Sequence, residues 1–288
     1  MQMIAHKENK RPVGFIGQGY IGKNYADDFE KRGFSTVRYA LEEPYRNNEE
    51  KIKECDIVFI AVPTPTTPQG FDDSIVRDAI SLTEMGSIVI VKSTIVPGTA
   101  KSLQMQYPDC ILFYSPEFLS EATAAHDAAH PFSNILGFAV DDEAHRFAAE
   151  RVHAILPSAP FSLTCDSTEA EIIKYAHNGS GFVEVVFFNI MYELAQKLGA
   201  DWAPVEKAIQ ADPYVAHRYA KPVHKTGRGA GGHCFIKDFA ALRGLCEQKG
   251  VDALGVSVLS ALEKKNNALL KGSNKDLDLL EGVYGDSA

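Results

Sequence analysis

The stretch VGFIGQGYIG, residues 13–22, decides the fold. It begins as a short apolar run and continues as Gly-x-Gly-x-x-Gly into a helical pattern. In this strand–turn–helix context the first glycine permits a tight turn, the second lets the backbone approach a pyrophosphate, and the third allows the helix to pack closely on the strand. The helix N-terminus then faces the phosphates. The stretch predicts a dinucleotide-binding unit, whose cofactor contacts Gly17, Gly19, Tyr20, Ile21 and Gly22.

Further apolar runs follow in the first half of the chain, and helical patterns separate them. Continuous β-branched runs are typical of strands that are buried on both faces, and therefore of a parallel sheet between two layers of helices. We predict an α/β fold with a Rossmann-like, doubly wound parallel sheet and right-handed crossovers. The expected strands are 13–16, 36–40, 57–62, 88–91, 111–114 and 134–138.

After Asp166 the pattern becomes helical. The stretch Thr168–Leu198 contains no proline and predicts one helix of about 30 residues, which is about 45 Å long. A helix of this length connects two units or forms a subunit interface. Its apolar run 182–188 is too wide for one buried stripe, so we expect a homodimer or higher homo-oligomer packed through this helix. We expect a Rossmann domain over 1–166, a helical central and dimerisation domain over 167–272, and a frayed polar tail over 273–288. Further helices of the central domain are expected at 202–210, 237–249 and 256–271.

The composition argues against a nucleic-acid-binding protein, a membrane protein and a disulfide-linked or metal-binding protein. The 288 residues carry 29 Lys and Arg against 38 Asp and Glu, a net charge of −9, and so lack the clustered cations that nucleic acids require. No apolar run reaches the ~20 residues of a membrane span, and the polar start MQMIAHKENK lacks the apolar core of a signal peptide. Five scattered cysteines without a CxxC pair indicate reduced thiols, neither disulfides nor a metal site. We therefore expect a cytoplasmic protein without a bound metal, a membrane contact or a nucleic-acid partner.

The cofactor subtype depends on the end of the second strand. A carboxylate at this point would hold the ribose 2′-hydroxyl of NAD, but Ala40 or Leu41 occupies the expected position. Glu42 and Glu43 lie just beyond, and either glutamate reaches the ribose or both are solvated turn residues. Two acidic residues without a basic cluster favour NAD over NADP, with Glu42 as the candidate ribose ligand.

Five motifs follow the glycine loop in order. They are AVPTP at 61–65, VKSTIVPGT at 91–99, SPEFLSE at 115–121, KYAHN at 174–178 and GGHCFIKD at 231–238. Together they resemble the UDP-glucose/GDP-mannose dehydrogenase family, over about Val13 to Leu270. That family oxidises C6 of a nucleotide sugar twice, from alcohol through aldehyde to carboxylate, with two NAD⁺ and a covalent cysteine intermediate. The resemblance implies the same chemistry for this chain, with UDP-glucose as the favoured substrate, and a place in polysaccharide biosynthesis.

The resemblance makes Cys234 the nucleophile, whose thiolate attacks the aldehyde and later carries a thioester. Its glycine-rich approach, 227–232, would let a sugar lie against the backbone. A lone cysteine is more often a small buried side chain, and we assign that role to the other four. Lys174 and Asn178 are four residues apart on the long helix and donate from one face, so the family match makes them the stabilisers of an alkoxide or oxyanion. By spacing alone, such a pair is a solvated helix face.

Carboxylates supply the expected acid–base chemistry. The resemblance implies a general acid or base role for Glu121 and a supporting role for Glu117, without separating the two firmly. It also implies that Thr94 orients a water, that Asp238 holds a catalytic water or helps to ionise Cys234, and that Lys237 either lies near phosphates or is a surface residue. For the cofactor, the remaining implied contacts are Val62, Pro63, Thr64, Ser93, Thr94 and Lys237. For the substrate, they are Glu117, Phe118, Leu119, Lys174, Asn178, Gly231, Gly232 and Arg218. The resemblance implies that Arg218 reaches across a dimer.

The chain departs from the family at three places. The link 41–56 is short, Phe132 and Ser133 occupy the region of a family arginine, and the chain stops at residue 288, where the family continues into a second Rossmann-like domain that binds the nucleoside. Two other interpretations stay open. A β-hydroxyacid dehydrogenase also has a glycine loop and a Lys-x-x-x-Asn helix but makes a single oxidation, for which Cys234 is not needed. A non-catalytic dinucleotide-binding or assembly protein would not require the catalytic set.

Overall fold

The computed structural model describes residues 11–225 and 227–285. The chain forms two compact units. The first comprises the chain up to Thr64 together with Asp73–Lys174, and the second comprises Pro65–Asp72 and the chain from Tyr175 onward. The boundary therefore lies later than the expected 166/167, and a short segment of the N-terminal half belongs to the second unit.

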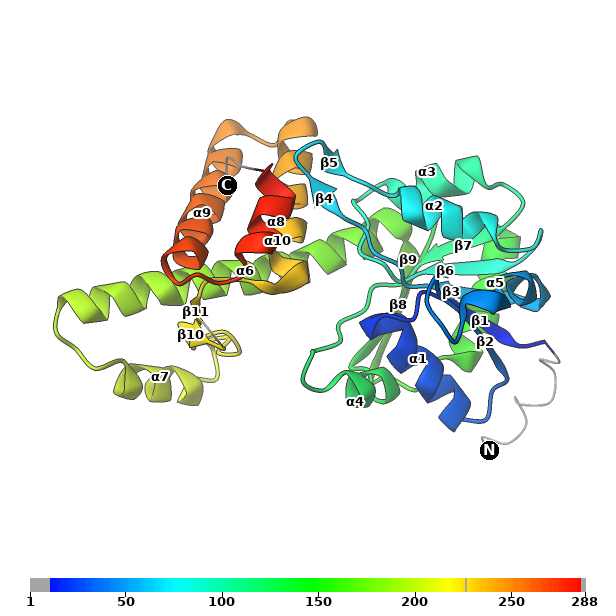
Figure 1. Ribbon diagram of the computed structural model, residues 1–288, viewed down its shortest axis with the longest axis horizontal. Coiled ribbons are helices and arrows are strands. Elements are labelled where there is room, and N and C mark those ends of the chain that lie inside the picture. The colour runs from blue at the N-terminus through cyan, green and yellow to red at the C-terminus, as the bar shows by residue number, and fades with distance from the viewer. Residues whose placement is uncertain (1–10, 226, 286–288) are drawn as a thin grey trace. The chain divides into compact units, whose positions relative to one another are not determined.

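The first unit is built on one seven-stranded sheet (Figure 1). Its order is β2 (Thr36–Tyr39), β1 (Val13–Ile16), β3 (Ile57–Ile60), β6 (Ile88–Val91), β7 (Ile111–Tyr114), β8 (Ser133–Phe138) and β9 (Phe161–Asp166). The strands from β2 to β7 are parallel, which confirms the Rossmann-like prediction. However, β8 runs antiparallel to β7, and β9 follows β8 in parallel. The sequence pattern does not predict β9, because FSLTCD mixes polar and apolar residues at a sheet edge.

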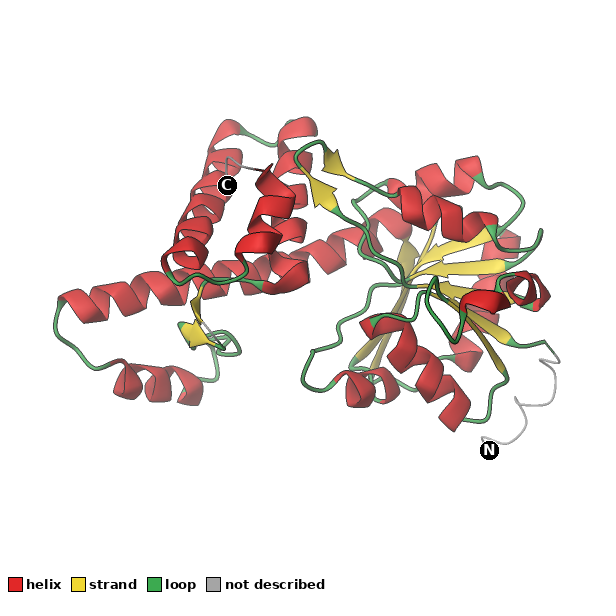
Figure 2. Ribbon diagram, viewed as in Figure 1, coloured by secondary structure: helices red, strands yellow, loops and turns green. Residues whose placement is uncertain are grey.

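Helices cover both faces of this sheet (Figures 1 and 2). On one face the rings of Phe15, Phe59 and Phe113 share a core with α1 (Tyr20–Lys31) and α5 (Glu143–Ile155). On the other face α2 (Ser74–Ser81) contacts β3, and α3 (Thr99–Gln106) contacts β7. The short α4 (Ala124–Ala129) packs against α1, and the link after β2 forms the 3₁₀ turns η2 (Arg46–Asn48) and η3 (Glu50–Glu54). Because both faces are covered, the central strands are continuous apolar runs.

One helix, α6 (Ser167–Lys197), carries the chain from the first unit into the second. Gly179 and Gly181 do not interrupt it. A Cβ at Gly181 would lie 2.8 Å from a ring carbon of Tyr219 and 3.0 Å from one of Phe235. The glycine therefore lets two aromatic rings pack directly on the helix, which offsets the ~1 kcal/mol that glycine costs in a helix interior.

The second unit is mainly helical and contains two short hairpins. Its helices are the later turns of α6 with α7 (Trp202–Ala211), α8 (Gly232–Gln248), α9 (Ala253–Gly272) and α10 (Leu277–Tyr284), and its hairpins are β4 (Thr66–Thr67) with β5 (Gly70–Phe71) and β10 (Val223–His224) with β11 (Gly227–Arg228). The β4–β5 hairpin contacts α8. Stacked rings of Phe182 and Phe239, 3.7 Å apart, join α6 to α8. Within the described residues, no helix combines the length and apolarity that crossing a membrane requires.

The structure differs from two predictions for this unit. The helix expected at 237–249 begins at Gly232, so Cys234 lies in the first turn of α8 and not in a loop before it. The expected frayed tail contains α10, because Leu280 and Val283 pack against the core of α8 and α9. Tyr284 adds a hydrogen bond of 2.7 Å to Glu263. Residues 286–288 of that prediction lie outside the described part of the chain.

A buried carboxylate ties the start of α6 to α3. The two oxygens of Glu171 accept hydrogen bonds from the backbone N–H of Gly98 at 2.6 Å and of Ala100 at 2.8 Å. These are donors that the first turn of a helix leaves unpaired, at the end where the helix dipole favours a negative charge. Burial nevertheless outweighs these bonds and raises the pKa of Glu171 to about 7.

This raised pKa predicts a pH-dependent stability difference between the wild type and Glu171→Gln. Below its unfolded pKa the group is neutral in both states. Between that pKa and about 7 the unfolded chain ionises the group while the fold keeps it neutral, so the wild type loses up to about 3 kcal/mol of stability, and the loss levels off above about 7. The amide never ionises and does not undergo this loss. Unfolding curves from pH 5 to pH 8 should therefore show the variant gaining stability relative to the wild type. Parallel curves would contradict the assignment.

Candidate active site

The carboxyl ends of β1, β3, β6 and β7 meet at one edge of the sheet, because these strands are parallel neighbours. The chain runs from β1 outward to β2 and then returns to β3 on the other side of β1. Open α/β sheets bind ligands at such a reversal of strand order. The glycine loop, AVPTP, the KST segment and SPEFLSE each follow one of these strand ends.

The glycine loop has the shape that a pyrophosphate requires. A Cβ at Gly17, where φ is +90°, would collide with the carbonyl oxygen of Ala61, and one at Gly22 would collide with that of Gly17. A Cβ at Gly19 would meet no atom within 4 Å. The outer two glycines thus serve packing, whereas the middle one opens onto free space. The helix α1 starts directly afterwards without a side-chain cap, so its first N–H groups suit a phosphate.

The strand β2, next to the glycine loop, carries a cation that is already paired. Arg38 is buried, and its guanidinium lies 2.7 Å from carboxylate oxygens of both Asp27 and Glu30 on α1. These ion pairs keep the side chain from serving a 2′-phosphate, which agrees with NAD. Glu42 and Glu43 are exposed just beyond the strand.

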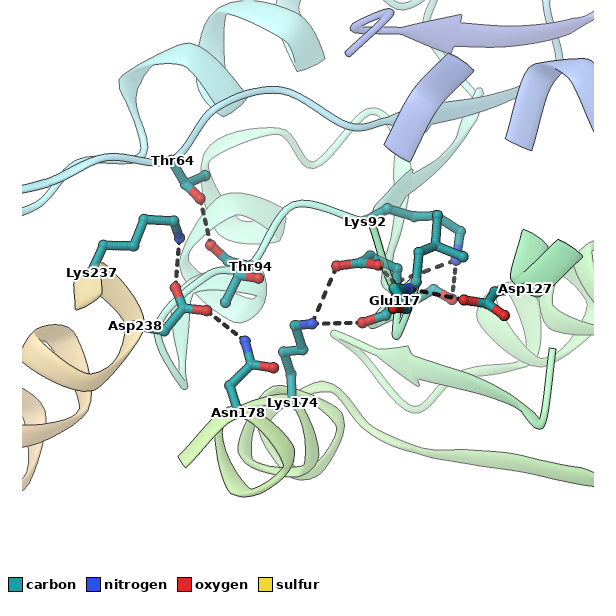
Figure 3. Close-up of polar contacts among 12 residues, drawn as sticks. Thr64, Lys92, Thr94, Glu117, Asp127, Lys174, Asn178, Lys237 and Asp238 are labelled. Atoms are coloured by element: carbon teal, nitrogen blue, oxygen red, sulfur yellow. Dashed lines mark hydrogen bonds and ion pairs between the residues drawn. The ribbon is translucent and has the colours of Figure 1, made fainter. Parts of the chain in front are cut away.

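The loops after β3 and β6 are bonded to each other. The hydroxyl of Ser93 accepts from the N–H of Val62 at 2.9 Å and donates to its carbonyl at 2.7 Å. The hydroxyl of Thr64 donates to the carbonyl of Thr94 at 2.8 Å (Figure 3). The expected cofactor residues of these two loops therefore form one structure, with Pro63 exposed upon it.

A buried ion pair joins α6 to the loop after β7. The ammonium of Lys174 donates to the backbone carbonyl of Glu117 at 2.6 Å and lies 3.2 Å from its carboxylate (Figure 3). The second carboxylate oxygen accepts from the N–H of Leu119 at 2.8 Å, and the ring of Phe118 lies 5.4 Å from the ammonium. In contrast, Glu121 is exposed in a turn before α4, so the two glutamates do not share a helix.

A second buried cation is Lys92, which lies in the motif VKST and has no role predicted from the sequence. Its ammonium donates to the hydroxyl of Ser115 at 3.1 Å and lies 4.4 Å from the ring centre of Tyr25. Burial lowers its pKa to about 8, although the nearby charge of Glu117 acts in the opposite direction. A lysine directly after a four-residue apolar strand is the signal that would have identified it.

The second unit gathers another polar group around Asp238. This buried carboxylate accepts from the amide of Asn178 at 2.6 Å and from the ammonium of Lys237 at 2.6 Å (Figure 3). Cys234 lies four residues earlier on α8, hence on the same helix face, and is exposed. Arg218 is exposed, with its guanidinium 5.6 Å from the ring centre of Tyr219.

Comparison with known proteins identifies the origin of this arrangement. Residues 41–156 match the NAD binding domain of the UDP-glucose/GDP-mannose dehydrogenase family, and residues 168–268 match its central domain. The chain belongs to the UDP-glucose/GDP-mannose dehydrogenase family. NAD is therefore its cofactor, in agreement with the glycine cradle and the paired Arg38.

Individual members of this family cover most of the chain. YtcA of Bacillus subtilis is 30% identical over 282 residues, which are 93% of this chain and 62% of YtcA. The UDP-glucose 6-dehydrogenase of Rickettsia conorii is 28% identical over 83% of this chain and 55% of its own length. The structure of a UDP-glucose dehydrogenase from Pyrobaculum islandicum superposes with a TM-score of 0.75 at 26% identity, covering 89% of this chain and 68% of that one. The chain thus spans less than two thirds of the two sequence relatives.

The geometry of the glycine loop predicts different effects for two glycine substitutions. Gly19→Ala places its methyl group in open space, so the melting temperature should stay within about 2 °C while the dissociation constant for NAD⁺ rises about tenfold or more. Gly22→Ala forces a collision inside the turn and should lower stability by about 2–4 kcal/mol. Thermal unfolding and NAD⁺ titration calorimetry measure both quantities. Equal melting temperatures for the two variants would contradict this division of roles.

Proposed function

We propose that this protein oxidises the C6 hydroxyl of a UDP-sugar to the carboxylate in two NAD-dependent steps, with UDP-glucose as the favoured substrate. The observation that carries the proposal is the position of Cys234. Its thiol is exposed in the first turn of α8, one turn before a buried Asp238 that is bonded to Asn178. A single oxidation would need no thiol, whereas a second oxidation proceeds through one.

The first oxidation needs a proton acceptor and stabilisation of an alkoxide. NAD, when bound, accepts the hydride in each oxidation. We assign the buried pair of Lys174 and Glu117 to the substrate oxygen, because a fixed ammonium stabilises negative charge strongly where water is excluded. Asn178 lies one turn further along α6 and donates from the same helix face. We assign the proton transfer to a carboxylate of SPEFLSE, either Glu117 or Glu121.

The second oxidation proceeds on the cysteine. The thiolate of Cys234 adds to the aldehyde carbon and forms a thiohemiacetal, loss of a second hydride gives a thioester, and water then releases the carboxylate and the free thiol. The balance is one alcohol, two NAD⁺ and one water giving one carboxylate, two NADH and three protons. Asp238 and Thr94 are the candidates for holding that water. Because the thiol has to stay reduced, we propose that the protein acts in the cytoplasm.

This mechanism predicts the yield of NADH per sugar. The wild type should form two NADH for each UDP-glucose consumed. Cys234→Ala should form at most one and release no acid, because no thioester forms. Cys246→Ala, at the other end of α8, is the matched control and should behave as the wild type. Two NADH from Cys234→Ala would contradict the assignment of the nucleophile, and one NADH from the wild type would favour the β-hydroxyacid interpretation.

The choice of sugar needs a separate comparison. The same assay with UDP-glucose, UDP-N-acetylmannosamine and GDP-mannose should give the highest kcat/KM for UDP-glucose. A higher value for another sugar would replace UDP-glucose in the proposal and leave the two-step chemistry in place.

A second copy of this chain is the proposed partner. Exposed apolar side chains recur at helical spacing along α6 and at the residue after its end: Val183, Phe187 (53% exposed), Ile190, Leu194 (49% exposed) and Leu198. Within the expected run 182–188, Phe182, Val186 and Phe188 are buried inside the unit, whereas Val183 and Phe187 lie on this exposed stripe. The stripe is therefore the surface that supports packing against a second copy. We propose that two copies pack through it, and that Arg218 reaches the substrate of the neighbouring copy.

Charges placed on the stripe should separate the copies. We expect the wild type to elute and scatter light as a dimer or larger, and the double variant Phe187→Glu, Leu194→Glu to be a monomer. Leu254→Glu changes an apolar side chain that is 79% exposed on α9 and serves as the matched control, which should stay oligomeric. A monomeric wild type would overturn this part of the proposal.

A further inference from the structure

Side chains from α9 and the turn after it hold the loop that leads into α8. The amide oxygen of Asn266 accepts from the N–H of Ala230 at 2.7 Å, and its amide nitrogen donates to the carbonyl of the same residue at 2.9 Å. The hydroxyl of Ser273 accepts from the N–H of Arg228 at 2.9 Å. Two residues of the loop 228–232, Arg228 and Ala230, are thus held by side chains from outside the loop.

The remaining bonds involve two charged side chains. The ammonium of Lys275 donates to the carbonyl of Gly229 at 2.8 Å, and a carboxylate oxygen of Asp276 accepts from the N–H of Gly232 at 2.7 Å. Lys275 is buried, and desolvation lowers its pKa. Asp276 has φ of +52°, which is rare for a residue other than glycine. Burial of an ammonium and an unusual backbone conformation both cost free energy, so this arrangement is built at some expense to the fold.

The glycines of the loop lie against these same side chains. A Cβ at Gly227 would lie 2.5 Å from the hydroxyl of Ser273, one at Gly231 would collide with the carboxylate of Asp276, and one at Gly229 would lie 3.1 Å from the amide of Asn266. The sequence analysis explains these glycines by a sugar lying against the backbone. The contacts give them a second reason, because larger residues would push away the side chains that hold the loop.

We propose that four side chains from the end of α9 and the turn before α10 are positioning residues for the catalytic thiol: Asn266, Ser273, Lys275 and Asp276. They fix the backbone from which the first turn of α8 projects Cys234. This inference rests on the proposed function, in which Cys234 is the nucleophile. None of the four is assigned a contact with the substrate or cofactor.

The chemical reason is the geometry of a covalent step. A thiolate adds to an aldehyde only when sulfur and carbon approach within about 3–3.5 Å along the correct direction. Cys234 lies in the first turn of α8, directly after this loop, so the conformation of the loop sets the position of its backbone. A displacement of about 1 Å at such a group can lower the rate about 100-fold.

Asn266→Ala tests this directly, with Asn267→Ala as the matched control on the next position of the same helix. We expect the Asn266 variant to lower kcat about 10- to 100-fold while the KM values for sugar and NAD⁺ change less than about threefold. The control should keep its kcat. Ser273→Ala, a milder change that removes one bond to the loop, should lower kcat about threefold or more and keeps the test available if the larger change impairs folding.

Hydrogen exchange provides a readout that does not depend on turnover. The N–H groups of Ala230 and Gly232 are bonded to Asn266 and Asp276, so in Asn266→Ala the peptide containing 228–234 should exchange faster while the far end of α8 is unchanged. Slow exchange together with an unchanged kcat would overturn the proposal. Faster exchange in a protein whose wild type forms no NADH would leave the held loop in place and contradict the proposed function instead.

A double-mutant cycle separates the two explanations for the glycines. Gly231→Ala should lower kcat by displacing Asp276, and Asp276→Gly, which suits the positive φ, should lower it by removing the same bond. If both act through that bond, the double variant should be no worse than the more impaired single variant. Effects on kcat that multiply would show that Gly231 acts independently of Asp276 and would overturn the second reason given for this glycine. An unchanged kcat in Asp276→Gly would overturn the placement of Asp276 among the positioning residues.

Discussion

The unbroken backbone hydrogen bonding of α6 is the constraint on which both units depend. Its first turns belong to the first unit, where Glu171 caps α3 and Lys174 meets Glu117. Its later turns belong to the second unit, where Phe182 stacks on Phe239. Glycine normally weakens the interior of a helix. At Gly181 the missing side chain leaves room for two aromatic rings to pack on the helix, and this packing offsets the cost. One continuous helix therefore carries Lys174 and, one turn later, Asn178.

The buried charged groups at the proposed site have polar partners within their own unit. Burying an ammonium or a carboxylate alone would cost several kcal/mol. The ion pair of Lys174 with Glu117 meets this cost, and Asp238 meets it through Asn178 and Lys237. These bonds also orient the groups in advance, which is the property that stabilisation of a developing oxyanion requires.

The same type of contact recurs at three places in the structure. A side chain from a distant part of the chain bonds directly to the backbone of a loop. The side chain of Ser93 bonds to the backbone of Val62, that of Glu171 to Gly98 and Ala100, and that of Asn266 to Ala230. Loops are normally the mobile part of a fold, so a group on a loop gains a defined position only when such bonds are present. The residues that determine the proposed reaction rate therefore include several that are not expected to touch the substrate.

The sequence by itself determined the strands of the parallel sheet, the long helix, the dinucleotide loop and the family, because these depend on local periods, turn glycines and ordered motifs. It placed the start of α8 wrongly and missed α10 and β9, since the burial that stabilises short or mixed segments comes from distant residues. It gave no role to Lys92 or Asn266, and it did not predict that Glu171 bonds the start of α3. Their roles rest on bonds such as those that join Glu171 to Gly98 across 73 positions and Asn266 to Ala230 across 36. Only the tertiary structure decides such bonds, because they form between segments that no sequence period relates.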